Sequence, residues 1–236
     1  MAVTVQHLDD YRGQPTWKIG TPAATYFYHQ TGGGLAGLID PAGVDWIDYR
    51  PGGGSDGKYR GIPNAIHPDG GFHPGNPDCA SELIETNEKR VVIESRKGAP
   101  HPDWRCTWTI TETAAAMHMD RVGGPYWMLY EGTPGGDYDE AAAFWEDSAG
   151  TRHSCADTWE GRLPSPRSAT FGTPASPYRL RLTDDTERPA DVADSYWSME
   201  KNMTVLGFGR LLDSKSDRWM HLNETPCRLI VEMLRA

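Results

Sequence analysis

The segment between residues 59 and 76 is the most unusual in the chain, because it gathers groups that could bind an acidic ligand and move a proton. These are one aromatic residue, one arginine, one amide and two histidines: Tyr59, Arg60, Asn64, His67 and His73. An arginine can hold a carboxylate through two parallel hydrogen bonds. A histidine titrates near neutral pH and can therefore act as a base or an acid. Glycines and prolines interrupt the segment, so we expect a loop over much of it, a common place for binding groups. The alternative is that these polar side chains only satisfy the backbone of the loop.

A second candidate lies in the run that precedes Gly132. Its alternation predicts a strand with Tyr126, Met128 and Tyr130 on one face. Trp127, Leu129 and Glu131 then share the other face. Glu131 stands at the end of this strand, where a carboxylate can face a cleft, and Tyr130 is a candidate acid. A solvated carboxylate at a strand end is the alternative.

Other residues are candidates for ligand binding rather than for proton transfer. Exposed tryptophans stack on the flat C–H faces of sugar rings, so we include Trp127 and also Trp197, which falls in an expected surface loop at residues 194–200. Arg210 follows an expected strand. His118 alternates with Ala116 and Asp120 and shares their face, although a lone histidine in a strand is more often structural.

We expect no metal or other cofactor. His67 and His73 could bind a divalent ion together with a remote carboxylate, but two histidines with five residues between them in a loop are not a specific metal signature. The sequence has no P-loop and no HExxH motif, and it has no GxSxG elbow and no GxGxxG run that opens an expected helix.

The composition predicts an all-β protein, a single antiparallel β-sandwich domain over residues 1–236 with super-sandwich or jelly-roll-like strands and little helix. The 26 glycines and 18 prolines suit many short strands joined by tight turns. Runs rich in β-formers predict strands at residues 24–29, 35–39, 44–49, 90–95, 104–111, 115–122, 126–131, 178–182, 203–208 and 227–234. One short helix is expected at 139–147, where three alanines are adjacent, and loops are expected over most of 150–177.

The net charge and the hydropathy of the chain disfavour some classes of binding partner. The net charge of −10 disfavours attraction to nucleic acid or to an anionic membrane, and no apolar run is long enough to span a bilayer. The first residues lack the features of a secretory signal, so we expect a cytoplasmic protein, or a secreted one if a signal has been removed. The four widely spaced cysteines favour free thiols. The oligomeric state stays open.

Two segments resemble the galactose-mutarotase-like superfamily of β-sandwich carbohydrate proteins. Residues 32–46, with the run Leu-Ile-Asp-Pro-Ala-Gly, look like the opening hairpin of such proteins. Residues 60–64, Arg-Gly-Ile-Pro-Asn, are similar to the Arg-Gly-Gly-Ile-Pro stretch of sugar epimerases in that group. The resemblance implies an antiparallel super-sandwich with a sugar cleft on a concave face. The chain departs from the epimerases because it lacks their second histidine motif followed by a late catalytic glutamate.

These features favour a carbohydrate-active enzyme, first of all a polysaccharide lyase. β-Elimination at a uronic acid needs a neutraliser for the carboxylate, for which Arg60 and Asn64 are candidates, a base such as His73 or His67, and an acid such as Tyr130. A mutarotase-like sugar epimerase is one alternative. A glycoside hydrolase with two carboxylates, Glu131 with Asp120 or Glu200, is another. A non-catalytic carbohydrate-binding module is the third.

Overall fold

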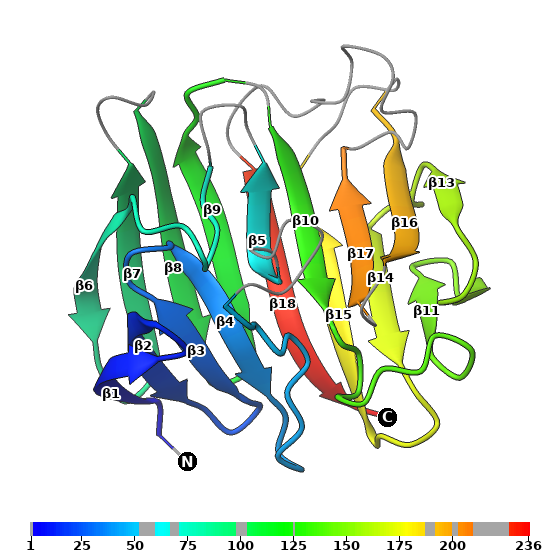
Figure 1. Ribbon diagram of the computed structural model, residues 1–236, viewed down its shortest axis with the longest axis horizontal. Coiled ribbons are helices and arrows are strands. Elements are labelled where there is room, and N and C mark those ends of the chain that lie inside the picture. Colours follow the sequence, from blue (N-terminus) through cyan, green and yellow to red (C-terminus); the bar gives the residue numbers. More distant parts are fainter. Residues whose placement is uncertain are drawn as a thin grey trace.

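The described part of the chain forms two antiparallel sheets of nine strands each (Figure 1). The computed structural model describes residues 2–51, 60–66, 71–97, 103–124, 126–186, 192–199, 203–209 and 227–236. Within these ranges there is no helix, so the predicted all-β sandwich is confirmed.

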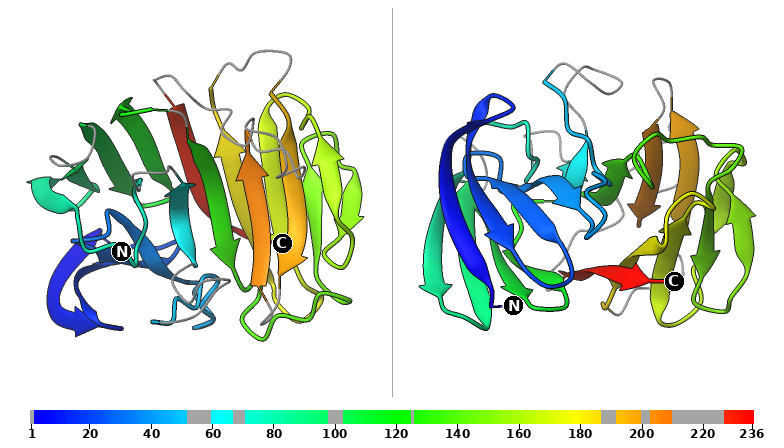
Figure 2. Two further views of the ribbon diagram at one scale, coloured as in Figure 1. Left: turned by 45° about the horizontal axis from the view of Figure 1, so that its top comes forward. Right: turned by 90° about the horizontal axis from the view of Figure 1, so that it is seen from below.

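The first sheet has its strands side by side in the order β1 (Thr4–Tyr11), β2 (Gln14–Gly20), β3 (Thr25–His29), β4 (Gly34–Ile39), β5 (Gly61–Ile66), β10 (Trp127–Gly132), β17 (Met203–Phe208), β16 (Asp194–Met199) and β13 (Trp159–Gly161). The second runs in the order β12 (Arg152–Ser154), β11 (Phe144–Asp147), β14 (Arg167–Gly172), β15 (Tyr178–Asp184), β18 (Cys227–Arg235), β9 (Ala115–Arg121), β8 (Trp104–Thr111), β7 (Arg90–Lys97) and β6 (Ala80–Thr86). The views of Figure 2 show the two sheets as separate layers, with β18 in one and β10, β17 and β16 in the other.

Alternation along the strands builds the interior between the sheets. In β8 the side chains of Trp104, Cys106, Trp108 and Ile110 are buried while their neighbours are partly or fully exposed. Side chains of the same kind on the first sheet, such as Tyr28, face them, and the Tyr28 and Trp108 rings meet edge to face at 6.2 Å. Burying large aromatic side chains contributes about 1.5–3 kcal/mol each, which gives the sandwich its stability. All four cysteines are free and buried.

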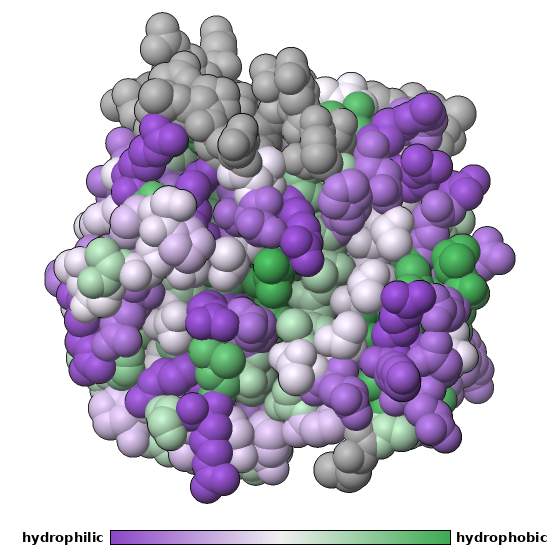
Figure 3. Space-filling view, turned by 180° about the vertical axis from the view of Figure 1, so that it is seen from behind, coloured by the Kyte–Doolittle hydropathy of each residue, from purple (hydrophilic) through white to green (hydrophobic). Residues whose placement is uncertain are grey.

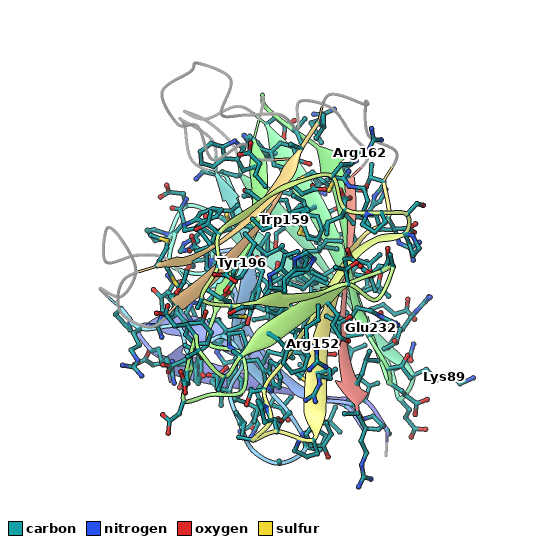
Figure 4. All side chains as sticks on the ribbon, turned by 90° about the vertical axis from the view of Figure 1, so that its right-hand side faces the viewer. Lys89, Arg152, Trp159, Arg162, Tyr196 and Glu232 are labelled. Atoms are coloured by element: carbon teal, nitrogen blue, oxygen red, sulfur yellow. The ribbon has the colours of Figure 1, made fainter. Side chains whose placement is uncertain are left out.

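Aromatic rings close the end of the sandwich at β11, β12 and β13. Trp145 of β11 stacks on His153 of β12 at 3.9 Å and meets Trp159 of β13 at 5.2 Å. The Tyr196 hydroxyl donates to the Cys155 carbonyl at 2.9 Å. Figure 4 looks at this end, with Trp159 and Tyr196 between Arg162 and Arg152. The cluster therefore joins strands of both sheets.

The predicted helix at 139–147 is wrong. The chain makes one turn, in which Ala143 N donates to the Asp139 carbonyl at 2.8 Å, and then enters strand β11. Phe144 and Trp145 are buried there against the sheet. Packing two aromatic side chains outweighs the few tenths of a kcal/mol per residue by which alanine favours a helix.

The strand expected at 44–49 is also absent. Only an isolated bridge joins Ile39 to Asp45, because aspartate side chains replace strand partners in this segment. Asp40 accepts hydrogen bonds from Ala42 N and Val44 N at 2.8 and 3.1 Å, and Asp45 accepts one from Ile47 N at 3.0 Å. The segment is a loop held by its own carboxylates.

Conversely, three regions expected to be irregular contain strands. Residues 61–66 form β5, residues 150–177 contain β12, β13 and β14, and residues 194–199 form β16. β5 pairs with β10, β14 with β11 and β16 with β17. The pattern within each segment does not reveal its partner strand.

Candidate functional site

The outer face of the first sheet carries an apolar cluster of its own, separate from the sandwich interior. Trp127 and Leu129 of β10 pack with Met203 and Val205 of β17. Met128 and Tyr130 of β10 belong to the interior cluster instead. The predicted division of this strand into two faces is therefore confirmed, and the face that holds Trp127 and Leu129 points away from the second sheet.

Glu131 belongs to this outer face by the same alternation. It lies opposite Gly61 of β5 and Val205 of β17, in the middle of the sheet, and is only 4% exposed. A carboxyl group in this position can accept and return a proton. Glu131 is the strongest candidate for proton transfer among the described residues.

Asn64 stands beside it on the neighbouring strand. It pairs with Leu129 and is 2% exposed. Among the residues that the structure describes, its Nδ2 has no hydrogen-bond partner. A buried donor without a partner costs about 1–3 kcal/mol, so this amide suits a bound oxygen atom.

Trp197 of β16 completes the group. It lies two strands from Glu131, opposite Val205, and its partly buried ring packs against the apolar cluster. The order β5–β10–β17–β16 thus brings four of the predicted residues, Asn64, Trp127, Glu131 and Trp197, onto one face. We call this set the β10 face.

His73 lies elsewhere, in the interior. It is 6% exposed, and its Nδ1 accepts a hydrogen bond from Gly75 N at 3.0 Å. Burial, together with the smaller effects of the nearby His29 and Lys97, lowers the pKa of His73 to about 3. The expectation that this ring titrates near neutrality is wrong, because the interior disfavours the imidazolium.

This pKa has a consequence for stability that can be measured. The pKa of His73 in the folded protein lies below the unfolded value of 6.5. The neutral ring therefore contributes stability above about pH 6.5, and this contribution is lost as the pH falls toward 3. We expect wild type to lose about 2 kcal/mol more unfolding free energy than His73→Asn between pH 7.5 and pH 5 in urea titrations. Asparagine keeps an acceptor near the Nδ1 position but does not titrate. Equal losses would contradict the burial of a neutral ring.

Arg60 is bound to Asp48, twelve residues earlier in the chain. Its Nη1 donates to the Asp48 carboxylate at 3.0 Å and to the Asp48 carbonyl at 3.1 Å. Arg12 and Arg50 also pair with Asp48, and these arginines hold the pKa of that carboxyl below its usual value although partial burial opposes them. Arg60, Asp48 and Thr133 line a polar depression of about 400 Å³, so the guanidinium is engaged with a protein carboxylate.

Tyr130 and His118 are not on the β10 face. The Tyr130 hydroxyl lies inside the sandwich and donates to the Trp46 carbonyl at 2.7 Å, and burial raises the pKa of Tyr130 well above its usual value. His118, 47% exposed, pairs with Asp120 at 2.9 Å on the outer face of the second sheet. That is the back of the molecule, where hydrophilic and apolar residues are interspersed (Figure 3).

The remaining predicted residues fall outside the described ones: Tyr59, His67 and Arg210, together with Glu200 of the hydrolase alternative. Sequence analysis overlooked Ser195, Met203 and Val205. The alternation of the run 203–208 was the available signal, since it places Met203, Val205 and Gly207 on one face.

A cluster of three or more metal ligands and a membrane-spanning helix are both absent from the described residues. No group of three or more potential metal ligands occurs within the described ranges. Among the same residues, no helix is long and apolar enough to cross a membrane.

Comparisons with known proteins place the architecture. No family model matches the sequence, and no curated protein matches it either. The structure is similar to a candidate mutarotase, YeaD, from Salmonella typhimurium, with a TM-score of 0.60 and 9% identity over 100% of this chain and 94% of that one. A candidate aldose 1-epimerase from Escherichia coli K12 gives a TM-score of 0.53 and 8% identity over 99% and 100% of the two chains.

A protein from Synechocystis sp. PCC 6803 is similar as well, with a TM-score of 0.53 and 10% identity over 99% of this chain and 96% of that one. At such low identity the likeness concerns the fold, and it extends over nearly the whole length of each chain. The chain therefore shares the β-sandwich fold of these solved structures, with a buried carboxylate on the outer face of one sheet.

Proposed function

We propose that the protein binds a sugar on the β10 face and interconverts its anomers, with Glu131 carrying the proton. The observation that carries the proposal is the buried carboxylate of Glu131 on the same sheet face as two indoles and the unpartnered Asn64 amide. The partly buried Trp197 indole offers a stacking surface for a sugar ring, and the Asn64 amide offers a donor for one of its oxygens. The similarity to candidate mutarotase and epimerase structures supports the same class of ligand.

The chemistry needs one group that can accept and return a proton. The Glu131 carboxylate takes the proton from the anomeric hydroxyl while the bond between the anomeric carbon and the ring oxygen breaks. The same carboxyl group then gives that proton to the ring oxygen, which leaves the open-chain aldehyde and restores the carboxylate. Closure on the other face of the carbonyl reverses these steps and gives the other anomer.

The first expectation, β-elimination, lacks an assembled set of groups in the described part of the chain. Arg60 is engaged with Asp48, His73 lies in the interior, and Tyr130 faces the core. A hydrolase pair of Glu131 with Asp120 is excluded by position, because the two carboxylates lie on opposite outer faces of the sandwich. The epimerase alternative therefore fits the geometry better.

Polarimetry on freshly dissolved α-D-glucose, α-D-galactose and α-D-mannose tests the proposal. We expect the protein to accelerate the change of optical rotation of at least one of these sugars above the buffer rate. Binding of a sugar by calorimetry without any acceleration would instead identify a carbohydrate-binding module. Neither binding nor acceleration with any of them would overturn the proposal.

Replacing Asn64 by leucine should weaken sugar binding without lowering the unfolding free energy. Leucine has nearly the same shape and removes the unpartnered donor, so we expect Asn64→Leu to leave the unfolding free energy unchanged or to raise it by up to about 1–3 kcal/mol. Loss of the hydrogen bond should weaken sugar binding by roughly tenfold. Chemical denaturation and calorimetry measure the two effects. A clear loss of stability would show that the Asn64 amide serves the fold rather than a ligand.

A further inference from the structure

A cross-strand row on the β10 face contains a second buried polar group without a partner. Asn64 pairs with Leu129, Leu129 with Gly207, and Gly207 with Ser195, so these residues share one face. Ser195 is fully buried, and within the described part of the chain its Oγ has no hydrogen-bond partner. The row therefore has a polar group at each end and only Leu129 and Gly207 between them.

The two polar groups are too far apart for one sugar ring. β5 and β16 are separated by three steps across the sheet, and neighbouring strands lie about 4.8 Å apart, so the row spans roughly 14 Å. A pyranose ring is much shorter than this. Two consecutive units of a sugar chain can reach from one end to the other.

An indole accompanies each end of the row. Trp127 lies two residues from Leu129 at the β5 end, and Trp197 lies two residues from Ser195 at the β16 end, each on the outer face. At the β16 end, the partly buried Trp197 ring can stack on the C–H face of a sugar ring while the Ser195 hydroxyl binds a rim oxygen. Gly207 carries no side chain between the two ends, so nothing projects from β17 at that point in the row.

We infer that the β10 face binds a reducing oligosaccharide in preference to a free monosaccharide. The reducing unit lies over β5 and β10, against Asn64, Trp127 and Glu131, and the next unit lies over β17 and β16, against Ser195 and Trp197. This inference rests on the proposed function, since it extends the same site. It adds a second subsite that determines the preferred length of the sugar.

Calorimetry with glucose, cellobiose, cellotriose, maltose and maltotriose tests the inference. We expect a disaccharide of at least one linkage to bind roughly tenfold more tightly than glucose. Trp197→Ala should weaken disaccharide binding more than glucose binding, so that the two affinities become equal. Ser195→Ala should lower disaccharide affinity alone, by roughly fivefold, and should not destabilise the fold because the hydroxyl is unpartnered.

The controls separate failure of the second subsite from failure of the site itself. Thr109→Ala removes a hydroxyl from the outer face of the second sheet and should change no affinity. If Trp197→Ala does not fold, Trp197→Phe and Ser195→Ala carry the test. Equal affinities for glucose and for all four longer sugars, or equal weakening of both classes by the Trp197 and Ser195 variants, would overturn the inference while leaving the proposed function standing. If no sugar binds or is interconverted, the proposed function itself fails.

Discussion

Replacing Glu131 by glutamine should abolish most of the turnover and leave most of the binding. Glutamine keeps the size of the side chain and its hydrogen-bonding capacity but cannot accept the proton of the anomeric hydroxyl. We expect the rate of anomer exchange to fall by about 10²–10⁴-fold, the usual contribution of one general acid–base group. Exchange NMR of the two anomers measures this rate at equilibrium.

The binding measurement makes this test specific. The sugar dissociation constant of Glu131→Gln should stay within about tenfold of wild type, a change of roughly 1.4 kcal/mol or less. Glu232→Gln is the matched control, because Glu232 lies on β18 in the second sheet and pairs with Arg181. It should exchange anomers at the wild-type rate. A Glu131→Gln enzyme with more than half of wild-type turnover would assign the proton transfer to another group.

The second large effect concerns stability. Asp194 of β16 is fully buried and pairs with Arg167 of β14, whose Nη1 also lies 3.2 Å from the Asp184 carboxylate. Asp194 accepts further hydrogen bonds from Leu163 N and Gly209 N, both at 3.1 Å. This group joins the two sheets. Removing one partner of a buried ion pair leaves a charge without compensation, so Asp194→Ala should cost about 3–5 kcal/mol of unfolding free energy.

A surface pair of the same geometry serves as the comparison. Arg181 and Glu232 make two parallel hydrogen bonds at 2.7 and 2.9 Å, but both side chains are partly exposed. Exposed pairs contribute about 0–1 kcal/mol, so Glu232→Ala should change the midpoint of a urea titration only slightly. If Asp194→Ala and Glu232→Ala lost similar amounts of unfolding free energy, burial would not increase the contribution of the Asp194 ion pair to stability.

Much of the fold follows from local pattern. Runs 104–111 and 203–208 were predicted at their observed bounds, and the preference for a strand in the last segment is confirmed by β18. In the runs 104–111 and 227–234, buried side chains alternate with partly or fully exposed ones. In the run 203–208 all residues are buried. The pattern failed where neighbours distant in sequence decide the structure, as at Phe144 and Trp145, whose burial against β14 overrides three helix-favouring alanines.

The site was predictable in part for the same reason. Alternation alone placed Trp127 and Glu131 on one face of β10 and Tyr130 on the other, which the structure confirms. Arg60 and His73 were chosen because of their residue types, and their surroundings come from remote residues, Asp48 for the arginine and Lys97 for the histidine. No local signal gives those contacts. Ser195 was overlooked because its importance lies in the row across four strands.

A crystal structure of the protein with bound glucose or cellobiose tests most directly whether the β10 face is the sugar site. We expect a pyranose ring over β5 and β10. Its anomeric oxygen should lie within hydrogen-bond distance of the Glu131 carboxylate, and another of its oxygens should accept a hydrogen bond from Asn64 Nδ2. A sugar bound instead in the depression beside Asp48 and Arg60, or on the outer face of the second sheet, would contradict it.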